Sequence, residues 1–225
     1  MKVYFSDIFE VPAKKLERHG AFNICLINDL PLFVDPFLLF NSRKPKYRAL
    51  HKEILKYVTF LRDTSIAGEV SDGLLSSWYR FPEIKQNWLG YSRIGNSGRG
   101  PGIKFAQALD QNLKGIFSDF DKQKISRSPH LEKLCLIKDN IGRDNISDFA
   151  TNLIKGFLLE YTQAFAQKHI SADKLKTLNI PHVEFNYSTS SWVTRSFTLP
   201  CFLNDYVLLT HKALLTKDET WINKP

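Results

Sequence analysis

The chain has 225 residues, of which 43% are hydrophobic and 13% aromatic, and this is enough to bury a substantial core. Its 31 Lys and Arg side chains exceed its 23 Asp and Glu, and the net charge of +8 favours polyanionic partners, nucleic acid above all. No run approaches the roughly 18 apolar residues that span a bilayer, the N-terminus lacks a signal-peptide pattern, and the three cysteines lack metal-ligand spacing, so we expect a cytoplasmic protein with no membrane partner.

The first 40 residues are predicted to be rich in β-strand. Apolar runs occupy residues 2–5, 21–27 and 32–39, and the sequences Asn28-Asp29 and Asp35-Pro36 interrupt them. These dipeptides favour turns, so the runs between them read as short strands.

Residues 45–63 are predicted to form an amphipathic helix. Apolar side chains recur there at three- and four-residue spacing: Tyr47, Leu50, Ile54, Val58 and Leu61. From residue 43 to residue 63, seven Lys and Arg side chains stand against Glu53 and Asp63, which predicts a basic outer face. Such a stripe is typical of a solvated helix face, and it also suits contact with nucleic acid.

The middle of the chain is expected to alternate helices and loops. We predict a short helix at residues 66–80 and another amphipathic helix at 103–118, on either side of a glycine-rich loop at 95–102. An exposed connection follows at residues 118–130.

The last third of the chain is expected to pass from helix to strand. A helix at residues 149–169 carries apolar side chains every four residues, and Ser147 or Asp148 is its expected N-cap. Three strands are predicted after it, at residues 182–187, 192–199 and 206–210. The whole pattern predicts an α/β or α+β fold with a mixed central sheet in a single domain over residues 1–225. The abrupt end of the chain suggests the N-terminal part of a longer protein, or a truncated variant.

Carboxylates gather in the segment LCLIKDNIGRDNISDF, residues 134–149, where an apolar run gives way to a loop and a helix. Asp144 and Asp148 are the candidate Mg²⁺ ligands, with Glu132 as a third oxygen donor, because hard cations prefer carboxylate oxygens and water. Such a metal activates water and neutralises a phosphoryl oxygen. The structural alternative makes Asp148 a helix cap and places Asp144 in a turn.

The sequence Glu83-Ile84-Lys85 is a second candidate. It matches the part of a nuclease pattern in which Glu holds the metal and Lys orients the water. On a strand, alternation would place Glu83 and Lys85 on one side. Here the pattern precedes the Asp cluster instead of following it, so a permuted arrangement would be needed.

The glycine-rich loop is a candidate phosphate-binding segment. Glycines let backbone N–H groups approach an anion, and Arg93, Arg99 and Lys104 add positive charge. Trp88 precedes the loop and could either stack on bases or anchor the loop to the core. The segment matches neither the P-loop nor the dinucleotide-binding motif, so we expect contacts with a phosphate backbone rather than an ATP site.

Three segments resemble a group of uncharacterised bacterial proteins from mobile elements and phage-defence islands: FPEIKQNWLGYSRIGNSGRGPG, HLEKLCLIKDNIGRDNISDFATNLIKGFLLEYTQAF and LTHKALLTKDETWIN. In that group the polypeptide continues beyond the WIN segment. The GRDNISD stretch is also similar to the metal-binding Asp region of restriction-endonuclease-like nucleases, which implies a divergent core of that fold. The chain departs from that pattern after the long helix, where Glu184 has no following Glu-x-Lys.

These features predict a metal-dependent nuclease or nucleic-acid-processing effector in anti-phage defence. Its expected site combines metal ligands, a lysine acting on water and phosphate-binding cations: Asp144, Asp148, Glu132 or Glu83, Lys85, Arg99 and Lys104. The alternative is a non-catalytic module that senses phage protein or nucleic acid, or scaffolds a partner protein. A third reading is a DNA-binding protein that uses only its basic faces.

Overall fold

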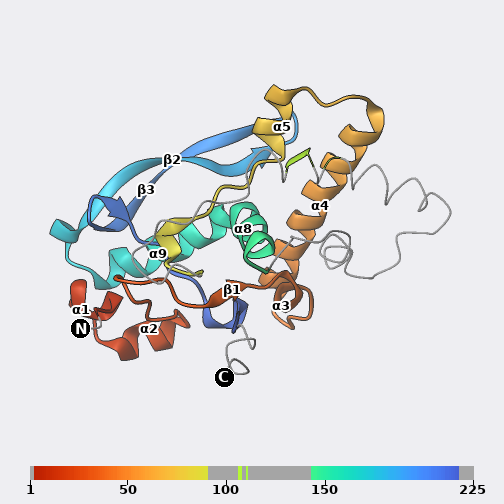
Figure 1. Cartoon of the computed structure of the whole chain (residues 1–225). Coiled ribbons are helices and arrows are strands. Elements are labelled where there is room, and N and C mark those ends of the chain that lie inside the picture. Colours follow the sequence, from red (N-terminus) through yellow and green to blue (C-terminus); the bar gives the residue numbers. More distant parts are fainter. Residues whose placement is uncertain (1–2, 91–105, 108–109, 111–142, 218–225) are drawn as a thin grey trace, which may run out of the picture. The chain divides into compact units, whose positions relative to one another are not determined.

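The computed structural model describes residues 3–90, 106–107, 110 and 143–217 (Figure 1). Both helices and strands are present, which confirms the predicted mixed α/β class. The chain forms two compact units. Unit 1 comprises Met1–Asp35, Ile84–Gly98 and Ile154–Pro225, and unit 2 comprises Pro36–Glu83 and Arg99–Leu153. Each unit is thus assembled from separated segments, and the prediction of one domain over residues 1–225 stays a prediction.

Unit 1 contains all the strands that the structure describes. Its helical elements are α1 (Phe5–Ile8), α2 (Ala13–His19), η1 (Lys85–Asn87), α9 (Lys155–His169), η2 (Ala172–Lys174) and η3 (Lys212–Leu214). Its strands are β1 (Leu32–Val34), β2 (Leu175–Asn186), β3 (Ser191–Phe202), β4 (Asp205–Tyr206) and β5 (Leu215–Lys217). They pair in two antiparallel sheets, β1 with β5 and β2-β3-β4, rather than in one mixed central sheet.

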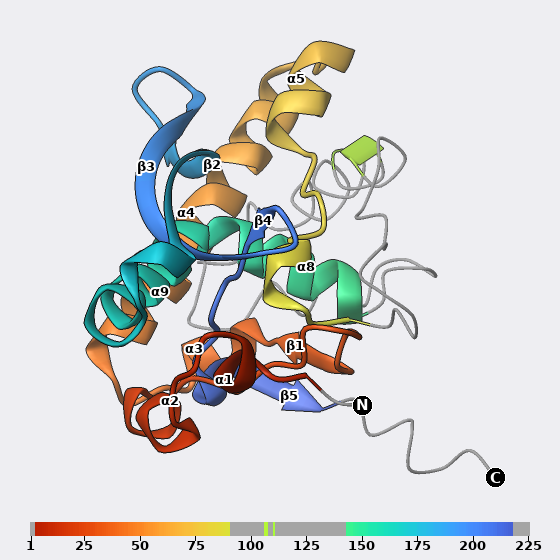
Figure 2. The same cartoon turned by 90° about the vertical axis from the view of Figure 1, so that its left-hand side faces the viewer.

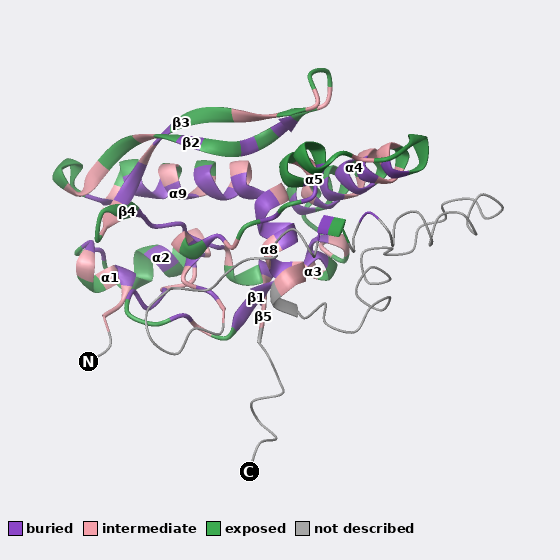
Figure 3. Ribbon diagram, turned by 45° about the horizontal axis from the view of Figure 1, so that its top comes forward, coloured by how far each residue is buried: buried purple, intermediate pink, exposed green. Residues whose placement is uncertain are grey.

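A long hairpin of β2 and β3 is the main sheet of unit 1. Leu175 pairs with Pro200 at its open end, and Asn186 pairs with Ser191 next to the turn. Helix α9 lies along this hairpin (Figure 1). Buried residues alternate with intermediate and exposed ones along the helix (Figure 3), so one face of α9 closes the core of unit 1. The strands predicted at residues 182–187 and 192–199 are confirmed and are longer than expected.

A β-bulge interrupts β2 between Ile180 and Glu184. His182, within the bulge, has φ +53, a left-handed conformation that residues other than glycine adopt rarely. Gly156 of α9 faces the bulge, because a Cβ added there would lie 3.2 Å from the backbone oxygen of Val183. The absence of a side chain at Gly156 therefore lets the helix approach the strand closely.

The strand-rich prediction for the first 40 residues is wrong in most of that range. Phe5 begins α1 instead of ending a strand, because the Asp7 carboxylate accepts a hydrogen bond of 2.9 Å from the Tyr4 N–H and so caps the turn. The expected strand at residues 21–27 is reduced to isolated bridges, including Tyr4 with Cys25. Within residues 3–40, only β1 forms as a strand, paired with β5 (Figure 2).

Unit 2 is helical in the residues that the structure describes. Its helices are α3 (Pro36–Phe40), α4 (Pro45–Ala67), α5 (Asp72–Trp78) and α8 (Arg143–Leu153). The helix predicted at 45–63 is confirmed as α4, with Pro45 in its first turn, where the missing N–H has no helical partner to lose. The helix predicted at 66–80 is shorter than expected: α5 starts after Ser71, whose hydroxyl accepts from the Leu74 N–H.

The helix predicted at residues 149–169 is two helices, α8 and α9, separated by Ile154. Asp148 lies inside α8, so neither it nor Ser147 is the N-cap that we predicted. In the last turns of α8, Thr151 Oγ1 donates to the Ser147 carbonyl at 2.6 Å and Asn152 Nδ2 donates to the Asp148 carbonyl at 2.8 Å.

The helix predicted at residues 103–118 lies mostly outside the described residues. Ala106, Gln107 and Asp110 are described, and all three are helical. None of the helices in the described part of the chain combines the length and apolar character needed to cross a membrane.

Candidate functional site

The outer face of α4 carries a row of cations. Arg48, Lys52 and Lys56 are exposed and lie four residues apart, which places them on one face of the helix. Each step of four residues rises about 6 Å, so the row covers about 12 Å of helix. Duplex DNA presents one phosphate per about 3.4 Å of axis on each strand, so the row matches a stretch of several phosphates.

The buried face of α4 fixes the direction of this row. Tyr47, Ile54, Tyr57 and Leu61 are each at most 1% exposed and pack into the core of unit 2. Figure 3 shows the buried and exposed sides of α4 along its length. Because the apolar stripe holds one side of the helix inward, the cations on the opposite side face solvent.

More positive charge lies at the start of α4. The ammonium groups of Lys44 and Lys46 lie 5.4 and 5.0 Å from the centre of the Tyr47 ring, within the range of cation–π attraction. Arg43 precedes them and is exposed. We call Arg43, Lys44, Lys46, Arg48, Lys52 and Lys56 the α4 basic face.

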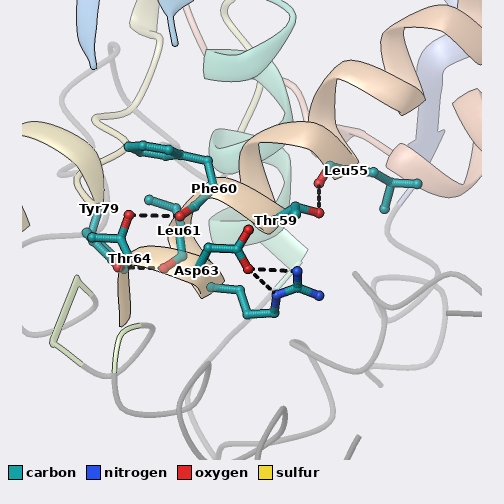
Figure 4. Close-up of polar contacts among 8 residues, drawn as sticks. Leu55, Thr59, Phe60, Leu61, Asp63, Thr64 and Tyr79 are labelled. Atoms are coloured by element: carbon teal, nitrogen blue, oxygen red, sulfur yellow. Dashed lines mark hydrogen bonds and ion pairs between the residues drawn. The ribbon is translucent and has the colours of Figure 1, made fainter. Parts of the chain in front are cut away.

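Hydrogen bonds tie α4 to the segment that follows it in unit 2. Tyr79 Oη donates to the Leu61 carbonyl at 2.9 Å (Figure 4), and Tyr57 Oη donates to the Trp78 carbonyl at 2.8 Å. Burial raises the pKa of Tyr79 to about 12. The phenol therefore stays protonated, and able to donate, at any physiological pH.

The second half of α4 is stabilised locally. Thr59 donates to the Leu55 carbonyl at 2.9 Å, and the Asp63 carboxylate pairs with Arg62 at 2.7 Å (Figure 4). The negative charge of Asp63 is therefore paired with Arg62 within the helix. Glu53 is the acid that lies among the cations of the exposed side of α4.

A buried polar cluster lies at the end of α4. Ser65 Oγ is 2.6 Å from Asp110 Oδ1 and 2.7 Å from Tyr79 Oη. All three residues are buried, and buried polar groups of this kind need partners of their own. We read this cluster as the support that positions α4 and not as a reactive site.

In unit 2, one amide joins the two backbone segments that carry the predicted acidic residues Glu83 and Asp148. Asn152 Nδ2 donates to the Pro82 carbonyl at 2.7 Å and to the Asp148 carbonyl at 2.8 Å. The ring centres of Phe81 and Phe149 lie 4.5 Å apart beside it. The backbone before Glu83 is therefore held against the turn of α8 that begins at Asp148. We call Glu83, Asp148 and Asn152 the acid junction.

The carboxylates of the acid junction differ in their surroundings. Asp148 is half-buried, and Glu83 is half-buried with its Oε2 atom fully shielded from solvent. Asp144 lies one turn before Asp148 in α8. Across the described residues, however, no three His, Cys, Asp or Glu side chains are grouped closely enough to hold a metal ion.

The remaining predicted site residues divide into two groups. Four fall outside the described residues: Arg93, Arg99, Lys104 and Glu132. Lys85 and Trp88 are described and belong to unit 1. The strand that would have aligned Lys85 with Glu83 is absent, because residues 85–87 form the 3₁₀ helix η1 and its tighter turn replaces the alternation of a strand.

Trp88 anchors the chain within unit 1. Its backbone has φ +54, its carbonyl accepts from the Leu30 N–H at 3.1 Å, and its ring centre lies 6.5 Å from that of Phe202. Of the two roles open to Trp88, these contacts favour anchoring over base stacking.

Sequence reasoning missed a buried amine in unit 1. Lys155 is 9% exposed, and its Nζ donates to the Pro181 carbonyl at 2.9 Å, beside the bulge that contains His182. Burial lowers the pKa of Lys155 to about 8. In the sequence, Lys155 is simply a lysine inside the helix predicted at residues 149–169. Asn152 was equally hidden, because its role depends on Pro82, 70 residues away.

Comparison with protein families gives one match. The model of the Domain of unknown function family DUF8370 matches residues 10–223. The chain belongs to DUF8370. No curated protein and no solved structure matched this DUF8370 chain.

Proposed function

We propose that this DUF8370 chain is a metal-dependent nuclease, or a related nucleic-acid-processing protein, that holds its substrate on the α4 basic face. The observation that carries the proposal is the exposed row Arg48, Lys52 and Lys56 in the same compact unit as the acid junction. We propose that it acts in anti-phage defence in the cytoplasm, and the resemblance of three sequence segments to proteins of phage-defence islands is what supports this part of the proposal.

The α4 basic face supports binding to a phosphate backbone. Its cations lie on a helix that is held by Tyr57 and Tyr79, so little backbone order has to be gained on binding. Contacts of this kind position a duplex or single strand without reading its sequence. The proposal therefore leaves the choice between DNA and RNA to experiment.

The acid junction supports the catalytic part of the proposal. Glu83 and Asp148, with Asp144 one turn earlier in α8, are oxygen donors of the type that Mg²⁺ prefers. Mg²⁺ commonly takes only one or two protein carboxylates and fills its other positions with water and substrate phosphates, so two carboxylates would be enough. Bound there, it would supply charge neutralisation and water activation. Asn152 would keep the Glu83 backbone in place.

Cleavage assays test the catalytic part. The purified chain is incubated with labelled single- and double-stranded DNA and RNA in Mg²⁺, in Mn²⁺ and in EDTA. We expect cleavage only with metal, and a loss of about tenfold or more in Asp148→Asn, Glu83→Gln and Asp144→Ala, as for other groups that support a metal. Glu69→Gln, an exposed acid of unit 2 outside the junction, is the matched control. Undiminished cleavage by the junction variants would refute this site.

Binding assays test the α4 basic face separately. The variant Arg48→Gln/Lys52→Gln/Lys56→Gln should show a salt dependence of log affinity that is shallower by nearly three, because each lost phosphate contact removes about 0.9 from the slope on duplex DNA. Arg80→Gln removes an exposed cation of unit 2 outside the face and should remove at most one contact. A triple variant with the wild-type slope would exclude α4 as the binding surface.

A non-catalytic role is the second candidate. The observation that favours it is the lack, among the described residues, of a group of three metal-ligating side chains. In that case the α4 basic face would hold nucleic acid for sensing, or for a partner protein that does the chemistry. Salt-dependent binding with no turnover in any metal would identify this role.

A further inference from the structure

Unit 1 has a charged surface that the proposed function does not use, formed where α2 packs on α9. Tyr161 Oη donates to the His19 carbonyl at 2.8 Å, and the His19 ring stacks on the Tyr161 ring with centres 4.2 Å apart. His19 Nε2 also lies 3.2 Å from the Tyr161 carbonyl. These contacts fix the end of α2 against the middle of α9.

The two helices run in opposite directions, which brings further cations together. The Phe165 ring lies between two histidines, with centres 5.1 Å from His19 and 4.9 Å from His169. Burial, together with the positive charges of Lys15, Lys168 and His19, lowers the pKa of His169. The start of α2 therefore lies beside the end of α9, and their charges repel one another.

The exposed cations of α2 share one face. Lys14 and Lys15 are four and three residues before Arg18, and like charges at these spacings repel along a helix. Glu17 lies three residues after Lys14 on the same face and offsets part of its charge, but it is one residue from Arg18 and two from Lys15 and does not face them. We call Lys14, Lys15, Arg18, His19, Lys168 and His169 the α2–α9 patch.

Neighbouring acids leave the patch positively charged. Glu10 pairs with Lys174 at 2.9 Å, and Asp173 accepts a hydrogen bond from Ser171. Within the part of the chain that the structure describes, no ion pair involves Lys14, Lys15, Arg18 or Lys168.

Helix stabilisation accounts for only part of this arrangement. Lys168 and His169 lie in the last turn of α9, where positive charge suits the helix dipole. Lys14 and Lys15 lie in the first turn of α2, where the dipole disfavours cations and where no acid is present. An anionic ligand would offset both the repulsion among these cations and their unfavourable interaction with the dipole of α2.

We propose that the α2–α9 patch is a second binding surface for the phosphate backbone of nucleic acid. Its ligand class rests on the proposed function, but its residues belong to the other compact unit and to none of the α4 basic face. The spread of charge over two helices suits a polyanion better than a single phosphate. A lipid surface fits less well, because none of the exposed large hydrophobic side chains in the described residues lies on α2 or α9 to insert among lipids.

The test measures binding of the whole chain to a labelled 20-base-pair DNA and to a single-stranded RNA over a range of salt concentrations. Lys15→Gln/Lys168→Gln should make the slope of log affinity against log salt on the duplex shallower by about two, at about 0.9 for each lost contact. Lys176→Gln/Lys212→Gln is the matched control, because both lysines are exposed cations of unit 1 outside the patch. All four lysines are exposed, so circular dichroism should show the same fold in each variant.

The outcomes separate this proposal from the proposed function. A wild-type slope in Lys15→Gln/Lys168→Gln, alongside a shallower slope in the α4 triple variant, would overturn the patch and leave the proposed function standing. A shallower slope in both would support both surfaces. If the chain bound vesicles containing phosphatidylserine through Lys15 and Lys168 but bound neither oligonucleotide, the patch would be a lipid-binding surface and the proposal would fall.

Discussion

Lys155 is a lysine at a buried position, where the removal of its ammonium group from water disfavours the charged form. Its ammonium has a hydrogen bond to the Pro181 carbonyl, but no ion pair involves it among the described residues. Its positive charge is a secondary cause, after burial, of the lowered pKa of nearby His182. A single backbone carbonyl offsets only part of the cost of removing an ammonium from water, so the neutral amine is the better-tolerated form.

The pH dependence of stability should reveal this residue. The pKa of Lys155 is about 8 in the folded chain and 10.5 ordinarily, a difference worth about 3 kcal/mol. Between these values the unfolded chain binds more protons, so the contribution of Lys155 to folding stability rises from pH 8 to pH 10. Urea denaturation at pH 7, 9 and 10 should show this rise in the wild type and not in Lys155→Met. The control Lys176→Met, at an exposed position, should follow the wild type. Parallel curves for wild type and Lys155→Met would contradict the assignment.

The helices show which structural features the sequence determines. The apolar periodicity of α4 is sustained over 23 residues, and Pro45 marks the start of the helix. Because the periodicity and this start signal agree, the sequence predicts α4 correctly. The four-residue apolar repeat after Phe149 is as regular, yet the chain leaves the helix at Ile154. Apolar periodicity continues through the break because residues on both sides are buried, and each side belongs to a different unit.

For the candidate site, the sequence predicts the residue types but not the contacts that bring their backbone segments together. The acidic residues and the basic helix face are visible as residue types at particular spacings, and Asp148 and Glu83 do lie in one unit. The Asn152 amide joins the backbone segments that carry them, through a contact over 70 residues that no local pattern encodes. The strand predictions for the short runs at residues 2–5 and 21–27 were wrong for a related reason, because caps and distant partners decide the structure of such short segments.

Asn152 should contribute measurably to the stability of unit 2. Asn152→Ala leaves the Pro82 carbonyl without this donor, and a part-buried hydrogen bond of this kind contributes about 0.5–1.5 kcal/mol. Asn152→Asp should be at least as destabilising, because a carboxylate would face the carbonyl oxygens of Pro82 and Asp148. Urea denaturation of each variant gives the change, and Ser76→Ala, an exposed change in α5, should stay within about 0.5 kcal/mol of wild type. An Asn152→Ala variant as stable as wild type would show that the amide does not hold the junction.

At the scale of the whole molecule, the chain order and the compact units do not coincide. Unit 1 takes its segments from the beginning, the middle and the end of the chain, and unit 2 takes the two stretches between them. Strand β1 pairs with β5, and the end of α2 is bonded to α9, so the first 35 residues depend on the last 72. Unit 1 therefore cannot form until most of the chain is present, whereas every segment of unit 2 ends by Leu153.

A fragment of residues 1–153 should for this reason fold in one part only. Its unit 2 segments are complete, so α4 should keep slow amide hydrogen exchange, as helices with buried faces do. Residues 3–35 lack β5 and Tyr161, so their amides should exchange freely. Adding a separate fragment of residues 154–225 should restore protection to residues 3–35, because it supplies both missing partners. Equal protection of residues 3–35 with and without the second fragment would mean that this region folds without α9 and β5, and would refute the dependence argued from the pairing.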